Sequence, residues 1–464
     1  MTEQRERGFI DGAFAIGSGT VAVRALSVIL AMGLGRLLGP SGLGTFFTLM
    51  AAAEVAGLIA DLGVGVNLSR AVGPLDDRDA LTVLREALAL RMILAIPASG
   101  IFFAYVLSTR SAEYVVPGLL LAGYVALNGV MVVLRQWAMG RARFSVAGRS
   151  LVVAQVTLVV SALTTAAWGL GIGGLAAAEC LAAAAGCVYL LMTQRSWLLE
   201  KDWAGRGAPR ARRIGRLLLT SLPLGLAGLL ATAYSRFDLA LVSFLVGDAE
   251  AGLYGAALQP YLACTALAGV LYSVVVPNVA RALPSGHTGS SGPWVTATRT
   301  HVIGWLLAAV VYCVSELAVR LLYGRDFAAA VPVLQVMSFA LPAVFFSNVV
   351  LGRAVGEKRM SLALWIGVLG VVGTIGLELA LVPSIGSLGA ATSTLVVETA
   401  IALVLAATVL KSPVRGFAWV WVPATVLSIA AVATQRLLGW PPLVLLPAVI
   451  SIAVLLYRSV KRPA

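Results

Sequence analysis

The stretch GRLLGPSGLGTFF, residues 35–47, breaks a long apolar segment with an arginine, a Gly-Pro pair and two further glycines. A similar stretch, FLVGDAEAGLYGAA, occurs at residues 244–257. Apolar runs long enough to cross about 30 Å of hydrocarbon flank both stretches. Because glycine permits the positive φ that a tight reversal needs, both stretches predict a short hairpin between two membrane-spanning helices.

The composition places the rest of the chain in a membrane as well. Of 464 residues, 59% are hydrophobic and 12% are charged, which is too little charge to cover a soluble protein of this length. Backbone groups in lipid must bond to one another, so the spans are helices. The apolar runs also lack the alternation typical of a membrane barrel. We therefore expect an all-α polytopic membrane protein.

Fourteen spanning helices are expected. The predicted spans are 13–35, 44–69, 87–107, 115–134, 150–169, 172–192, 214–246, 252–280, 300–322, 331–351, 361–382, 386–410, 416–435 and 442–460.

The positions of lysine and arginine predict the orientation. With the N-terminus in the cytoplasm, the cytoplasmic segments hold 26 of the 34 basic residues and the opposite side holds five. Cytoplasmic loops of membrane proteins carry such an excess. The net charge of +13 therefore needs no nucleic-acid partner. The polar N-terminus lacks the pattern of a removable signal peptide, and both termini are expected in the cytoplasm.

The chain repeats itself at an offset of roughly 210 residues. Gly39 and Gly44 match Gly247 and Gly252, and three further pairs follow in order: VPGLL (116–120) with VPVLQ (331–335), GRAR (140–143) with GRAV (352–355), and IGGLAAA (172–178) with IGSLGAA (385–391). Such order predicts two related halves. Because each half holds an even number of spans, the halves are parallel repeats, with a substrate cleft expected between them.

The repeat and the long basic segment in the middle of the chain predict the domains. We expect an N-terminal six-helix lobe at 1–192, a cytoplasmic linker at 193–213, a C-terminal six-helix lobe at 214–410 and two additional helices at 411–464.

Two arginines inside spans are the candidate substrate-binding residues. Charges inside a membrane are costly and usually face a cavity or a partner. Arg24 and Arg236 occupy equivalent spans, about 22 Å and 16 Å below their hairpins at 1.5 Å per residue. The guanidinium group suits phosphate because its fork makes paired hydrogen bonds. The hydroxyl residues one turn away extend each arginine into a polar stripe; they are Thr20, Ser27 and Thr232.

The intramembrane acids leave alternatives open. Glu54 and Asp61 are seven residues apart and share a helix face, so either could pair with Arg24 or bind a proton or Na⁺. Asp238 is a further candidate, although it points away from Arg236. Arg91 lies near a helix end and is expected to snorkel to the membrane surface.

Other kinds of site are not indicated by the sequence. The four cysteines lie in apolar runs without a metal-binding spacing, and no nucleotide-binding loop is present. We predict no enzyme activity, no metal and no cofactor.

Several segments resemble one membrane transport family. LGRLLGPSGLGTFFTLMA (34–51), IADLGVGVNLSRAVG (59–73), RFDLALVSFLVGDAEAGLYGAA (236–257), LLYGRDFAAAVPVLQVMSF (321–339) and LVPSIGSLGAATSTLVVETA (381–400) are similar to the polysaccharide-type flippases of the multidrug/oligosaccharidyl-lipid/polysaccharide exporter superfamily. The resemblance implies two six-helix bundles around a cationic cavity. It also implies export of a polyprenyl-pyrophosphate-linked oligosaccharide across the bacterial cytoplasmic membrane by alternating access.

Two other functions stay open at this point. A cation-coupled drug or metabolite antiporter of the same superfamily would use acids in one half to bind protons or Na⁺. A scaffold of an envelope-synthesis complex would not need arginines in its spans. The flippase interpretation implies membrane lipids, a polysaccharide polymerase and glycosyltransferases as partners.

Overall fold

The structure is a computed structural model that describes residues 2–195, 211–282, 293–357 and 359–409. Every long element in these ranges is a helix, and no β-strand lies among them. By its internal contacts the chain divides into two compact units, residues 1–240 and residues 241–464. We call them unit 1 and unit 2 and describe each by itself.

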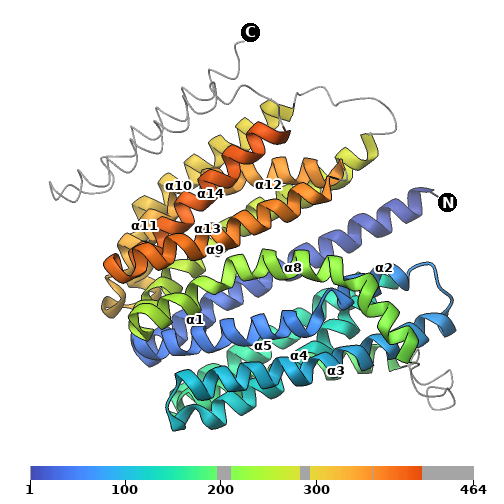
Figure 1. Ribbon diagram of the computed structural model, residues 1–464, viewed down its shortest axis with the longest axis horizontal. Helices are drawn as coiled ribbons and strands as arrows, with labels where there is room; N and C mark the ends of the chain where they lie inside the picture. The colour runs from blue at the N-terminus through green and yellow to red at the C-terminus, as the bar shows by residue number, and fades with distance from the viewer. Residues whose placement is uncertain (1, 196–210, 283–292, 358, 410–464) are drawn as a thin grey trace. The chain divides into compact units, whose positions relative to one another are not determined.

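Unit 1 is a bundle of long helices that lie side by side (Figure 1). α5 packs against α1 and α6, and α4 packs against α3 and α6. The helices are α1 (Thr2–Asp61), α2 (Val64–Ala71), α3 (Asp77–Thr109), α4 (Val115–Gly140), α5 (Phe144–Ala167), α6 (Gly171–Thr193) and α8 (Ala211–Val246), with a short 3-10 helix η1 (Ala112–Tyr114) before α4. Of α8, the part up to Ala240 belongs to unit 1.

Both glycine-rich stretches break the helical backbone. Within α1, Gly39 has a non-helical φ of 69° and is followed by Pro40, so α1 consists of two helices that meet there. Gly247, between α8 and α9, has a φ of 95°. This is the left-handed region that side chains with a Cβ rarely adopt. Each stretch thus contains a positive-φ glycine, but the GLG (42–44) and GLYG (252–255) segments expected to form the turns lie inside helices, so each turn comes earlier than predicted.

Unit 2 contains the remaining described helices (Figure 1). They are α9 (Asp248–Ala282), α10 (Pro293–Tyr323), α11 (Ala330–Ser338), α12 (Leu341–Gly356), α13 (Met360–Ile385) and α14 (Ser387–Val409), with a 3-10 helix η2 (Arg325–Phe327) before α11. α12 packs against α9, α10 and α14, and α13 packs against α14.

One span of unit 2 is broken. α11 and α12 meet at an angle of 42°, although the matching segment of unit 1, α4, is continuous. Gly304 on α10 lies against the break, where a Cβ would stand 2.6 Å from Cα of Pro342. The His301 ring, also on α10, has Nδ1 3.0 Å from the Pro342 carbonyl and accepts a hydrogen bond from Trp305 at Nε2. The buried His301 side chain is thus a packing element of this bend.

The helices confirm the prediction of an all-α polytopic membrane protein. Within the described ranges, nine helices are long and apolar enough to cross a membrane, or ten if α11 and α12 form one span. α1 counts there as one helix, although its break at Gly39 separates two of the predicted spans. The predicted spans at 416–435 and 442–460 lie outside the described residues, as does most of the predicted linker. The assignment of domains at 1–192, 193–213, 214–410 and 411–464 stays a prediction.

Candidate functional site

A buried ion pair occupies the interior of unit 1, near the end of α1. The Arg91 side chain on α3 is 2% exposed, and its Nη1 lies 3.6 Å from Oδ1 of Asp61. The same nitrogen donates a hydrogen bond to the Gly57 carbonyl at 2.8 Å. On α4, a Cβ at Gly129 would stand 2.4 Å from Nε of Arg91, so a glycine leaves room for the guanidinium. The prediction that Arg91 snorkels to the membrane surface is wrong, because its partners hold it inside.

Asp61 also organises the break between α1 and α2. Its Oδ1 accepts a hydrogen bond from the backbone N–H of Gly65 at 3.3 Å, in the first turn of α2. The intervening Leu62 and Gly63 both have positive φ, 40° and 79°. The Asp61 carboxylate therefore lies at the N-terminus of α2 and beside the buried Arg91 side chain. The ion pair of Asp61 is with Arg91, a partner that the sequence did not suggest, and the choice between an ion-coupling and a structural role stays a prediction.

A second acidic side chain of unit 1 was not singled out from the sequence as a site residue. Glu179 on α6 is 6% exposed, and Glu54 on α1 lies close enough to repel its charge. Spacing along one helix could not reveal this pair, because its members come from helices more than a hundred residues apart.

A polar stripe on α4 adds a further cationic group. Tyr124, Asn128 and Arg135 are spaced by four and seven residues, so they lie along one face of the helix. Arg135 is half-buried and lies within electrostatic range of Asp61. From the sequence, Arg135 was expected in a cytoplasmic segment, because the predicted span ended at 134. α4 continues to Gly140, which places Arg135 inside the helix.

The predicted substrate-binding residues are only partly visible. Arg24 on α1 is half-buried, and the hydroxyl of Ser27 donates to its own helix, to the Val23 carbonyl at 2.9 Å. Thr20, Thr232 and Arg236 lie on described helices, but their side chains lie outside the described part of the structure. The approach of Arg24 and Arg236 to a common cavity therefore stays a prediction. Asp238 is 6% exposed on α8.

The start of α8 is fastened to the α1–α2 break by direct contacts. Nδ2 of Asn67 on α2 donates hydrogen bonds to Oγ1 of Thr220 at 3.0 Å and Oγ of Ser221 at 2.9 Å. A Cβ at Gly225 would stand 2.1 Å from the backbone carbon of Leu62, and one at Gly63 would stand 2.4 Å from the backbone nitrogen of Gly225. The two backbones thus touch at a pair of glycines.

Arg141 fixes the loop that follows α2. Its Nη1 donates to the carbonyls of Val72 at 3.3 Å and Leu75 at 2.8 Å, and its Nη2 pairs with Asp77. Burial and the neighbouring Arg141 guanidinium lower the pKa of Arg143, while Asp77 opposes them. Arg141 belongs to the GRAR segment (140–143), one of the segments that repeat along the chain. In the structure its side chain holds the loop after α2 in place.

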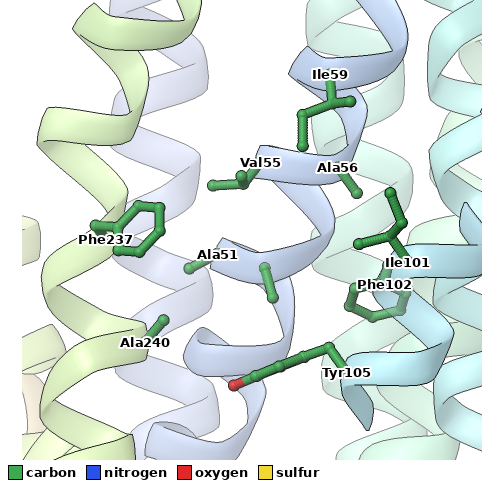
Figure 2. Close-up of a pocket in the computed structure, with 10 residues that line it drawn as sticks. Ala51, Val55, Ala56, Ile59, Ile101, Phe102, Tyr105, Phe237 and Ala240 are labelled. Carbon is green, nitrogen blue, oxygen red and sulfur yellow. The ribbon is translucent and has the colours of Figure 1, made fainter. Parts of the chain in front are cut away.

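An apolar cavity of about 330 Å³ lies between α1, α3 and α8 of unit 1 (Figure 2). Figure 2 shows aliphatic and aromatic side chains from the three helices pointing toward it. The residues that line it are Ala51, Ala52, Val55, Ala56, Ile59, Ile101, Phe102, Tyr105, Phe237 and Ala240. These residues could not be predicted from the sequence, because no motif distinguishes a cavity of this kind from ordinary packing.

The helical bundle and its long apolar helices define a polytopic membrane protein. In a comparison of structures, the lipid II flippase MurJ in an inward closed conformation matches with a TM-score of 0.73 and 12% identity, covering 97% of this chain and 98% of that one. An inward-facing multidrug resistance MATE transporter of the MOP superfamily matches with a TM-score of 0.64 and 17% identity, covering 83% and 96%. A MOP superfamily transporter from Pyrococcus furiosus matches at 0.58 and 16%, covering 87% and 96%.

Residues 9–283 match the family described as polysaccharide biosynthesis protein. This match covers more than half of the chain, and the chain therefore belongs to that family. Among proteins with a curated function, none matches the sequence significantly.

Proposed function

We propose that this protein is a flippase that moves a polyprenyl-pyrophosphate-linked oligosaccharide across the bacterial cytoplasmic membrane by alternating access. The observation that carries the proposal is the membership of the polysaccharide biosynthesis family in a chain with the fold of a lipid II flippase. A family concerned with polysaccharide and a transporter fold together favour a glycan carried on a lipid. We expect such a flippase to have both termini in the cytoplasm. Its expected partners are the polymerase and the glycosyltransferases that act on the same glycan.

In this proposal Arg24 and Arg236 bind the pyrophosphate. Arginine forks make paired, charge-assisted hydrogen bonds to phosphate oxygens. Arg24 is half-buried on α1, which is compatible with a wet vestibule lined also by Thr20, Ser27 and Thr232. Arg135 on α4 adds a second half-buried basic side chain to unit 1.

Export of the glycan tests the proposal. Cells that depend on this chain for a surface polysaccharide are expected to lose it with Arg24→Ala or Arg236→Ala, at unchanged protein level in the membrane. The matched control is Arg320→Ala, because Arg320 is 61% exposed and pairs with Glu316 on the same helix, a contact worth little. Unchanged export in both arginine variants would refute the assigned binding role, and export that survives deletion of the chain would refute the function.

A cation-coupled antiporter is the second candidate, and one observation favours it. The buried Glu179 on α6 lies within electrostatic range of the half-buried Glu54 on α1, and MATE transporters share the fold. For this function, the chain is expected to raise drug tolerance in a host without its own efflux pumps, and Glu179→Gln is expected to abolish the gain. The same pair could couple glycan export to protons or Na⁺. If glycan is the only cargo and its export no longer depends on protons or Na⁺ in Glu179→Gln, the two carboxyl groups belong to a flippase and not to an antiporter.

A further inference from the structure

The start of α8 has an apolar side and a positively charged side. Ile214, Leu217 and Leu218 pack against a hydrophobic core to which α2, α3 and α4 contribute most residues. Arg212 and Arg216 lie on the other side of the helix, where both are exposed. Their spacing of four residues puts the two guanidinium groups on one helix face. The first turns of α8 therefore present positive charge outward from unit 1.

An arginine of α2 lies beside this charge. Along α2 and α8 the contacts pair earlier residues of one helix with later residues of the other, so the two helices run antiparallel. Asn67 of α2 bonds to Thr220 of α8. The exposed Arg70 lies one turn beyond Asn67, and Arg216 lies one turn before Thr220. Because the helices are antiparallel, Arg70 and Arg216 lie at the same level and on the same side.

The positive charges at this surface exceed the negative ones. Arg213 is 52% exposed, and its Nη1 lies 3.6 Å from Oε1 of Glu86 on α3. The guanidinium groups of Arg70, Arg212 and Arg216 make no hydrogen bond or ion pair with a described residue. We call Arg70, Arg212, Arg213 and Arg216 the basic face. Its four like charges repel one another and share one carboxylate, so an anion bound there would be stabilising.

The length of α8 carries the basic face to the level of the lipid head groups. α8 has 36 residues, and Arg216 lies about 46 Å along the helix from Gly247 at 1.5 Å per residue. A bilayer with its head groups is about 40–45 Å thick. With the turn at Gly247 at one membrane surface, Arg216 therefore reaches the head groups of the opposite leaflet.

An exposed leucine distinguishes a lipid from a soluble anion. Leu219 is 71% exposed and lies three residues after Arg216, on the same helix face. A soluble anion would bind the arginines and leave Leu219 in water. A phospholipid offers its phosphate to the guanidinium groups and its acyl chain to the leucine. The charge pattern predicts the cytoplasm for this end of the helix, and the cytoplasmic leaflet is the one that attracts basic segments.

We propose that the basic face binds the head groups of anionic phospholipids and that Leu219 contacts their acyl chains. This surface is separate from the arginines assigned to the cargo. The inference makes no assumption about the cargo, so it is tested independently of the flippase.

Fluorescence quenching in vesicles tests the surface. Gly215 is exposed next to Arg216, and no atom lies within 4 Å of its Cβ. The full-length protein with Gly215→Cys receives a bimane label there, and the native protein treated alike gives the background. Phosphatidylcholine vesicles then receive a nitroxide-labelled phosphatidylglycerol or a nitroxide-labelled phosphatidylcholine, with the nitroxide near the carboxyl end of an acyl chain. We expect phosphatidylglycerol to reach half-quenching at a mole fraction at least about fivefold lower. Equal quenching by both lipids, or quenching by neither, would overturn the proposal.

Charge variants locate the effect. Arg212→Gln combined with Arg216→Gln is expected to remove the preference for phosphatidylglycerol. Arg212→Lys combined with Arg216→Lys is expected to keep most of it, because the positive charges remain. Arg325→Gln is the control, since Arg325 is exposed on η2 of unit 2, and it should leave the preference unchanged. A preference that the glutamine pair retains would contradict the surface. If the glutamine pair does not fold, Arg212→Gln alone should lower the preference about fivefold, and an unchanged preference would again be contrary to the proposal.

Discussion

The guanidinium of Arg91 is held by groups from two other helices. It bonds to the Gly57 carbonyl and pairs with Asp61 on α1, and its Nε faces Gly129 on α4. Removing one partner of a buried pair costs several kcal/mol, whereas the intact pair contributes little by itself. The contacts of Arg91 with Asp61 and Gly57 therefore specify how the helices of unit 1 pack. An unpaired charge would be costly in this buried position.

Gly129→Ala tests this packing at a single atom. The added Cβ would stand 2.4 Å from Nε of Arg91, and the guanidinium cannot retreat without losing its bonds to α1. We expect a loss of about 1–3 kcal/mol in the free energy of unfolding, seen as a lower midpoint of thermal unfolding in detergent. Gly123→Ala on the same helix is the control, because no atom lies within 4 Å of its Cβ. It should gain up to about 1 kcal/mol from helix propensity, and equal losses in both variants would contradict the argument.

The charged residues inside spans could be predicted from the sequence, but their partners could not. Arg24, Glu54 and Asp61 were recognisable as charges inside spans, since an apolar run makes any charge conspicuous. The partner of Asp61 was not recognisable, because spacing orders residues along one helix and says nothing about which helix lies beside it. Arg135 was missed for a different reason: the predicted end of its span fell one residue before it, and helix ends are the least certain part of such a prediction.

Breaks between helices could be predicted where they depend on the local residues, and not where they depend on packing against another helix. The positive φ of Gly39 and Gly247 follows from the glycines themselves. The bend between α11 and α12 does not, since VPVLQ matches VPGLL in the continuous α4. That bend lies against Gly304 and His301 of α10, so it depends on tertiary packing that the repeat could not reveal.

Gly225→Ala tests the attachment of α8 to the α1–α2 break. The Cβ would stand 2.1 Å from the backbone carbon of Leu62, and backbone atoms cannot move aside as a flexible side chain does. We expect separation of the two elements at a cost of about 1–3 kcal/mol, measured as a lower unfolding midpoint and faster proteolysis near residue 62.

Gly215→Ala is the control for that experiment. Gly215 is exposed on the same α8, with no atom within 4 Å of its Cβ. It should be neutral or slightly stabilising, because alanine is the better helix former. If Gly225→Ala behaves like Gly215→Ala, the close approach of the two backbones is not required for stability.

At the scale of the whole molecule, composition and the length of the apolar runs were sufficient to predict an all-α polytopic membrane protein. The length of the apolar runs requires helices that span a bilayer, and the described helices agree. The cavity between α1, α3 and α8 could not be foreseen, because its walls are ordinary apolar residues brought together from three distant segments.

The orientation of the molecule is the last prediction, and it follows from charge alone. Segments carrying most of the 34 basic residues should stay in the cytoplasm, because positive loops resist translocation. Ser111→Cys, in the exposed loop before η1, and Ala142→Cys, in the exposed loop after α4, lie at opposite ends of α4. A membrane-impermeant maleimide should label the first variant in intact cells and the second only after permeabilisation. The native protein is the control, since its four cysteines lie within apolar runs. The reverse pattern would invert the topology and place the basic segments outside, where the charge rule does not allow them.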